Sequence, residues 1–164
     1  MKTITNIIKK IIDILLTLVI IIGIVFVFLY AIRIEPYVVL SGSMEPAIET
    51  GSIVFIDKSA RFDEIREKDI IAFKLNDTMV THRVVEVTSQ GLITKGDANS
   101  TNDGGFVIAE NFIGKNVFNV PKVGFFVRVI QSQNGKIIFI AGIVLLFVMS
   151  FIGDKKEKPD YVKE

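Results

Sequence analysis

Two long apolar runs constrain the fold of this 164-residue chain more than any other feature. The first, residues 14–32, contains no charged side chain. At helical rise it would cover roughly 28 Å, close to the ~30 Å hydrocarbon thickness of a bilayer. The second, residues 137–152, is also uncharged but shorter than the usual ~20 residues, and it can extend across Gly153. We therefore expect transmembrane helices at residues 14–32 and 137–153.

Each run has a competing interpretation. The first could be a cleavable signal peptide, but its length exceeds the roughly 7–15 apolar residues of such a segment, and no small-x-small cleavage site follows it. A retained anchor is therefore favoured. The second could be a buried core helix because it is short. Against this, Lys155, Lys156 and Lys158 follow it at once, as they would after a stop-transfer segment.

The lysines that flank the two runs predict the orientation of the chain. Basic residues precede the first run and cluster after the second, and such residues stay on the cytoplasmic side of a membrane. We expect residues 1–13 and 154–164 to be the cytoplasmic N-terminus and tail in the plasma membrane, and residues 33–136 to form an extracytoplasmic domain. That domain carries nearly equal numbers of basic and acidic residues, so it offers no basic surplus for nucleic acid.

Several kinds of functional site are disfavoured because the sequence lacks the residues that they need. The chain has one histidine and no cysteine, whereas a zinc site takes three or four histidine, cysteine or carboxylate ligands. No glycine-rich loop leads into Gly-Lys-Ser/Thr, as a phosphate cradle would. A Gly-x-Ser-x-Gly elbow is also missing, which argues against an α/β-hydrolase. We expect no metal and no cofactor.

The middle segment has the pattern of a mainly β fold. Short apolar or alternating stretches are separated by turn residues, which favours an antiparallel, β-barrel-like domain flanked by the two transmembrane helices. Residues 62–68 are expected to form a single helical turn, and residues 99–105 a surface loop. The predicted strands are residues 37–40, 52–56, 69–75, 79–87, 91–95 and 112–120.

The residues that could carry chemistry centre on Ser-Gly-Ser-Met-Glu-Pro at 41–46. A serine nucleophile needs a positioned base, for which histidine is the commonest choice, and a carboxylate that orients the imidazole. His82 is the one histidine, although a lone histidine in a strand is more often simply packed. Asp97 and Asp103 both lie on loops after strands, where aspartate often bonds its own backbone. Spacing alone does not choose between them.

These residues carry a resemblance to a known family. Five ordered segments between residues 35 and 124 are similar to the conserved boxes of type I signal peptidases. The histidine at position 82, where most bacterial members have lysine, is similar to the endoplasmic-reticulum-type (Ser/His) subfamily of eukaryotic complexes, archaea and some Gram-positive bacteria. The segments are Ser41–Pro46 with Ile53–Phe55, Asp69–Phe73, His82–Val85, Lys95–Asp103, and Ile113–Lys115 with Val120–Gly124.

The resemblance implies a role for each position. Ser43 matches the nucleophile, His82 the general base and Asp103 the essential acid of the subfamily. Asp97 matches a supporting acid, and Ser41 a hydroxyl that helps to bind the oxyanion. Two further positions depart from the pattern, since many members have Asp at position 52 and Gly at position 68, where this chain has serine and lysine.

The implied function is that of a membrane-bound serine endopeptidase. The resemblance implies preprotein signal peptides as substrates, and the lipid bilayer and the secretion translocon as partners. An extended substrate would pair with a strand edge near residues 37–42 and 79–83. One alternative is a non-enzymatic two-span β module that binds exported proteins. Another is a self-cleaving repressor-type protease with a similar β scaffold, which the two spans disfavour.

Residues 125–127, Phe-Phe-Val, precede the second apolar run directly. They have two interpretations from the sequence. They could lie at the membrane interface, or they could form a core strand.

Overall fold

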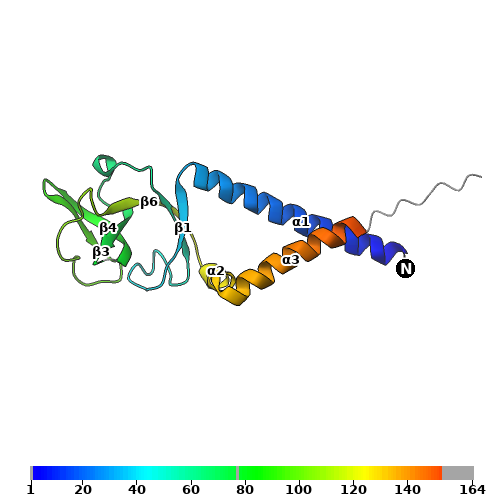
Figure 1. The fold of residues 1–164 in the computed structure, drawn as a ribbon. Helices are drawn as coiled ribbons and strands as arrows, with labels where there is room; N and C mark the ends of the chain where they lie inside the picture. The colour runs from blue at the N-terminus through cyan, green and yellow to red at the C-terminus, as the bar shows by residue number, and fades with distance from the viewer. Residues whose placement is uncertain (1, 77, 153–164) are drawn as a thin grey trace, which may run out of the picture. The chain divides into compact units, whose positions relative to one another are not determined.

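The computed structural model describes residues 2–76 and 78–152 and divides the chain into two compact units. One unit, Val27–Gln131, contains the whole β-sheet. The other combines the N-terminal residues up to Phe26 with those from Ser132 onward. Figure 1 labels the main elements of both. The predicted cytoplasmic tail at 154–164 and Gly153, the last residue of the predicted second span, lie outside the described residues.

Six strands form one antiparallel sheet in the Val27–Gln131 unit, and the segments predicted from periodicity coincide with five of them to within a residue or two. The exception is β1, which begins at Ile34, where a strand over 37–40 was predicted. Its Pro36 is compatible with the fold because β1 is an edge strand. The strands are β1 (Ile34–Val38), β2 (Ile53–Asp57), β3 (Ile70–Leu75), β4 (Thr78–Thr88), β5 (Gly91–Lys95) and β6 (Phe112–Val120).

The last strand in the chain, β6, lies in the middle of the sheet. The spatial order is β1-β2-β6-β3-β4-β5, so β6 pairs with β2 on one side and with β3 on the other. Among the described strands, β6 is therefore the one link between a β1–β2 half and a β3–β4–β5 half.

The sheet is open. β1 and β5 end the strand order, and within the described residues they do not pair with each other. The predicted barrel-like closure is therefore not observed. Register shifts occur in the β2–β6, β3–β6 and β4–β5 pairs, and such irregularities bend a strand locally. Closure depends on pairing between strands that are far apart in the sequence, and local periodicity does not report such pairing.

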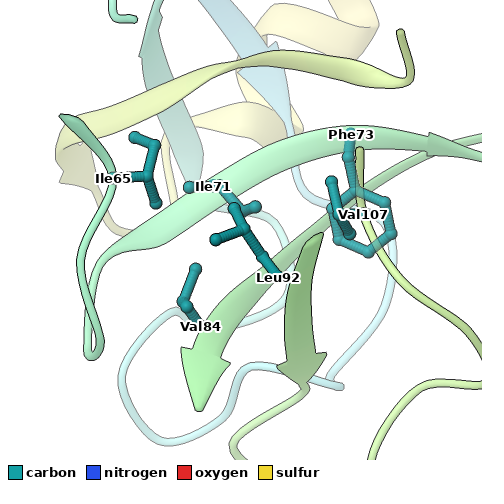
Figure 2. Close-up of a cluster of buried hydrophobic side chains, with 6 residues drawn as sticks. All are labelled: Ile65, Ile71, Phe73, Val84, Leu92 and Val107. Atoms are coloured by element: carbon teal, nitrogen blue, oxygen red, sulfur yellow. The ribbon is translucent and has the colours of Figure 1, made fainter. Parts of the chain in front are cut away.

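Two hydrophobic clusters occupy opposite faces of β3. Ile71 and Phe73 belong to the cluster drawn in Figure 2, together with Val84 and Leu92 of the neighbouring strands. Ala72, between them in sequence, belongs to the second cluster with Met44 and other residues. Successive side chains of a strand point to opposite faces, so β3 is buried on both faces, which explains its continuous apolar sequence.

The second unit contains α1 (Lys2–Ala31), up to Phe26, and α3 (Gln133–Ile152). Both helices contain a candidate membrane span, Asn6–Ala31 and Gln133–Ser150, and only 6% and 0% of these windows are buried. The structure therefore gives no support to a buried core helix for the second run. A polar pair joins the helices, because Ser150 Oγ donates a 2.7 Å hydrogen bond to Asp13 Oδ1.

Two short helices complete the sheet unit. A 3-10 helix, η1 (Phe62–Glu64), forms the single turn that was predicted within residues 62–68. The helix α2 (Gly124–Gln131) contains the Phe-Phe-Val segment. The interpretation of this segment as a core strand is therefore wrong.

Candidate active site

The Ser-Gly-Ser-Met-Glu-Pro segment forms a turn between β1 and β2, and the residues that follow Ser43 pack into the hydrophobic core. Met44 and Ile48 are 2% and 1% exposed and pack in the second cluster. The carboxylate of Glu45 accepts hydrogen bonds from the backbone N–H and the hydroxyl of Thr50, at 3.1 and 2.9 Å. These bonds lower the pKa of Glu45. Buried apolar anchors and this polar tie fix the backbone on which Ser43 is presented.

His82 lies on β4, opposite Ile71 of β3, and its imidazole is buried. The ring meets Phe73 edge to face, with 6.2 Å between the ring centroids. Its Nε2 is 3.0 Å from Ser43 Oγ, and its Nδ1 is 2.7 Å from Asp103 Oδ2. The tautomer with its proton on Nδ1 satisfies both contacts, because it donates to the carboxylate and accepts from the serine hydroxyl.

The carboxylate of Asp103 is held by Thr94 of β5, a residue that the sequence reasoning missed. Thr94 Oγ1 donates to Asp103 Oδ2 at 2.7 Å, and the backbone N–H of Asp103 donates to the Thr94 carbonyl at 2.8 Å. The Thr94 side chain is 1% exposed. Oδ2 of Asp103 therefore contacts both Thr94 and His82.

Asp97, the other candidate acid, pairs with Arg83 and not with His82. Arg83 Nε and Nη2 donate to Asp97 Oδ1 and Oδ2 at 2.8 and 2.6 Å, and Nη1 donates to the Lys68 carbonyl at 2.9 Å. Hydrogen bonding to the Asp97 carboxylate raises the pKa of the Arg83 guanidinium. This bidentate pair fastens the segment after β5 to β4.

The segment after β5 also holds the backbone of the serine turn. The N–H of Ala98 donates to the Ser43 carbonyl at 2.9 Å. A Cβ on Gly96 would lie 2.6 Å from that carbonyl oxygen and 3.0 Å from His82 Nε2. Glycine is therefore required at position 96 for the serine, the imidazole and this segment to approach so closely.

The second hydroxyl of the turn lies beside the first. Ser41 Oγ is 3.3 Å from Ser43 Oγ, so the sequence-predicted oxyanion residue is close to the sequence-predicted nucleophile. A cavity of about 280 Å³ opens at this point and is mostly apolar. It is lined by Val39, Leu40, Ser41, Ser43, Met44, Ile48, Leu75, Val80, Thr81 and His82.

The arrangement provides a hydroxyl, an imidazole and a carboxylate joined by hydrogen bonds, which is the order needed to activate a serine for acyl transfer. Within residues 2–76 and 78–152, no group of three or more His, Cys, Asp or Glu side chains is placed to hold a metal ion.

The two departures noted in the sequence lie outside this chain of contacts. Ser52 is fully buried, and its Oγ has no hydrogen-bond partner in the described part of the chain. Lys68 has a φ of 73°, a left-handed conformation that glycine adopts at little cost, so a glycine would suit this position.

Comparisons with known proteins identify the family of the chain. The family model described as "Signal peptidase, peptidase S26" matches residues 11–104. Signal peptidase I W of Bacillus subtilis (strain 168) is 38% identical over 123 residues, which cover 68% of this chain and 63% of that protein. The human signal peptidase complex catalytic subunit SEC11C is 41% identical over 75 residues, or 42% of this chain and 38% of that protein.

A fungal relative extends the similarity. The signal peptidase complex catalytic subunit sec11 of Sclerotinia sclerotiorum is 32% identical over 110 residues, which cover 59% of this chain and 63% of that protein. In these matches the chain spans less than two thirds of each relative's own length. The match to the family model by itself covers more than half of the chain, and its range contains Ser43, His82 and Asp103. The chain therefore belongs to the signal peptidase family, peptidase S26.

Proposed function

We propose that this protein is a membrane-bound serine endopeptidase that cleaves N-terminal signal peptides from exported preproteins. The observation that carries the proposal is the hydrogen-bonded series Ser43–His82–Asp103 in a chain of the signal peptidase family. The two candidate membrane spans support it, because a signal peptide is itself an apolar segment that lies in the bilayer.

The proposed reaction follows from the contacts. Ser43 Oγ attacks the scissile carbonyl carbon while His82 Nε2, 3.0 Å away, takes the hydroxyl proton. Asp103 keeps the imidazole in the required tautomer and stabilises the imidazolium. When the peptide C–N bond breaks, His82 returns the proton to the leaving amine. Water, deprotonated by the same imidazole, then hydrolyses the acyl-enzyme and frees Ser43.

In the proposed mechanism, two donors stabilise the negative oxygen of the tetrahedral intermediate. They are the backbone N–H of Ser43 and the hydroxyl of Ser41, which lies beside the nucleophile. Removal of one such donor costs on the order of 3 kcal/mol of transition-state stabilisation in other hydrolases. Ser41 should therefore matter for the rate, but less than Ser43.

The sheet leaves a free edge where a substrate would add. β5 pairs with β4 from Arg83 onward, so among the described strands residues 78–82 of β4 have β3 as their only neighbour. Val80 and Thr81 of this stretch line the cavity together with Val39 and Leu40, which follow β1. An extended peptide paired in this gap would bring its scissile bond to Ser43 and place alternate side chains in the apolar cavity.

The domain limits and the topology remain part of the proposal. Residues 33–136 would be the extracytoplasmic peptidase domain, with both termini in the cytoplasm. The relatives named SEC11 are catalytic subunits of a signal peptidase complex, and the family match supports signal peptides as substrates. Contact with the secretion translocon stays a prediction.

The test is to co-express an exported preprotein with the wild-type chain or with Ser43→Ala in a host that lacks other signal peptidases, and to sequence the mature N-termini. The Ser43→Ala variant should stay in the membrane and leave the preprotein uncut. Ser89→Ala, at an exposed serine in the turn between β4 and β5, is the matched control and should process normally. Normal processing by Ser43→Ala would exclude Ser43 as the nucleophile. No processing by the wild-type chain would end the peptidase proposal and leave the non-enzymatic β module as the better interpretation.

A further inference from the structure

The helix α2 has an exposed apolar face that the proposed reaction does not use. Phe125 and Phe126 are 69% and 68% exposed, and Val129 and Ile130 are 53% and 37% exposed. At ~100° per residue, these four positions fall within an arc of roughly 140° on one side of the helix. Large apolar side chains that are gathered on one exposed face mark an interaction surface.

The opposite side of α2 is fixed to the sheet unit. The N–H of Gly124 donates to the Gly51 carbonyl at 2.8 Å. A Cβ on Gly124 would lie 2.7 Å from that carbonyl oxygen and 2.9 Å from Val38 Cγ1. Val127 is half-buried. The close approach at Gly124 sets the rotation of α2, so its phenylalanine face is directed away from the domain.

We propose that α2 is an interfacial anchor that inserts Phe125 and Phe126 into the boundary between the headgroups and acyl chains of the bilayer. The first reason is its place in the chain. Ser132 is the one residue between α2 and α3, and α3 contains the candidate span Gln133–Ser150. If α3 spans through its uncharged run at 137–152, α2 ends a few residues before the membrane surface, which is where an amphipathic helix of this kind binds.

The second reason is charge. Between residues 111 and 153 the sequence contains no aspartate or glutamate, whereas it contains Lys115, Lys122, Arg128 and Lys136. The Lys122 side chain is 79% exposed and lies 3.6 Å from Glu49. Arg128 is exposed at the margin of the phenylalanine face. Lys115 is paired with Asp69, and Lys122 lies near Glu49, so the positive charge close to α2 rests mainly on Arg128 and Lys136. Basic residues beside an apolar face fit the anionic phosphates of lipid headgroups.

The anchor would also fix the height of the active site. A groove of about 330 Å³ runs from Phe125 and Arg128 to Val38 and Leu40, and Val39 and Leu40 also line the cavity at Ser43. The surface that contacts lipid is therefore continuous with the site. Insertion of α2 would hold the Ser43 turn at a constant depth relative to a signal peptide in the same bilayer.

The experiment uses the absence of tryptophan from the chain. The full-length variants Phe126→Trp and Phe106→Trp are each reconstituted into vesicles of phosphatidylcholine and phosphatidylglycerol. Tryptophan emission is then measured with acyl-chain-brominated phosphatidylcholine and, separately, with aqueous acrylamide. Phe106 is the matched control because it is 42% exposed and adjoins Val107, which bridges to β5 at the opposite edge of the sheet from β1.

The tryptophan at position 126 should emit at shorter wavelength, be quenched several-fold more strongly by the brominated lipid than the control, and resist acrylamide. Equal acrylamide quenching of the two variants would overturn the proposal, and so would lipid quenching of both. A tryptophan at position 126 that resists acrylamide but is not quenched by brominated lipid would identify a protein, either a second copy or a partner, as the occupant of the face. The readout needs no peptide cleavage, so it is independent of the proposed peptidase activity.

Discussion

At the scale of single residues, the two candidate acids show what spacing along the chain does not decide. Asp97 and Asp103 both follow β5, but they bind different neighbours on β4. His82 and Arg83 are consecutive on a strand, so their side chains point to opposite faces. Each takes one carboxylate, Asp103 at His82 and Asp97 at Arg83. The pairing is visible only once the strand register places each basic side chain beside its acid.

Thr94 was missed for a related reason. A threonine in a strand is ordinary because β-branched residues favour strands, and nothing in its neighbours indicates a bond to a residue nine positions away. Its position was still informative. Thr94 follows Leu92 by two residues, so both point to the same face, and Leu92 is 2% exposed. An inward-facing hydroxyl needs a partner, and the partner is Asp103.

Thr94 should act as a positioning residue for Asp103. Replacement of Thr94 by Val removes the hydroxyl that donates to Oδ2 while nearly keeping the side-chain shape, so the carboxylate loses one of the two contacts that orient it. We expect kcat for a signal-peptide substrate to fall by about tenfold to a hundredfold, since a hydrogen bond to a charged group contributes roughly 1.5–3 kcal/mol. KM should change little, because Thr94 does not line the substrate cavity.

Thr94→Ser supplies the control, because it keeps the hydroxyl and should recover most of the wild-type kcat. Thermal unfolding of both variants separates a loss of fold from a loss of orientation. A role in packing alone would predict that Ser, which lacks the methyl group, is as impaired as Val.

At the scale of elements, the predicted strands were right wherever a stretch alternates or is uniformly apolar between turn residues, as in β3 and β5. The antiparallel sheet followed from the same pattern. The open edges of the sheet could not be predicted in this way. Closure depends on whether β1 pairs with β5, and these two strands are distant in the sequence. The Phe-Phe-Val segment of α2 was ambiguous because three residues are too few to show a helical period of 3.6.

The junction of β1 and β2 offers a test of pH dependence. Glu35 of β1 accepts hydrogen bonds from the Tyr37 hydroxyl at 2.7 Å and from Lys58 Nζ at 3.1 Å. These bonds lower the pKa of Glu35 below its ordinary value of 4.5. A carboxylate with a lowered pKa stabilises the fold above that ordinary value, and its contribution is lost as the pH falls through the pKa of the folded state.

We therefore expect Glu35→Gln to lower the thermal midpoint slightly at pH 7, by the equivalent of less than about 1 kcal/mol because the pair is partly exposed. The difference from wild type should shrink as the pH is lowered below 4.5. Glu86→Gln, at an exposed position of β4, serves as the reference and should show no such trend. If Glu35→Gln lowers the thermal midpoint by the same amount from pH 7 down to pH 3, the ionised Glu35 carboxylate does not stabilise the fold through these hydrogen bonds.

At the scale of the whole molecule, the two candidate spans and their flanking lysines predict that the sheet unit lies outside the cell membrane and both termini inside. The chain has no cysteine, so a single introduced thiol reports its own location. In intact cells, a membrane-impermeant maleimide should label Ser89→Cys in the β4–β5 turn. It should label Asn6→Cys, near the start of α1, only after the membrane is permeabilised. Labelling of Asn6→Cys in intact cells would reverse the predicted orientation.

The central place of β6 has a consequence for timing. Ser43 belongs to the β1–β2 half of the sheet, and His82 to the half that contains β3, β4 and β5. Among the described strands the halves are joined through β6, the last strand to leave the ribosome. A nascent chain that has already exposed its serine and its histidine still lacks the strand that brings them into one sheet. If the chain is the proposed peptidase, it should therefore remain inactive during synthesis until β6 has joined the sheet.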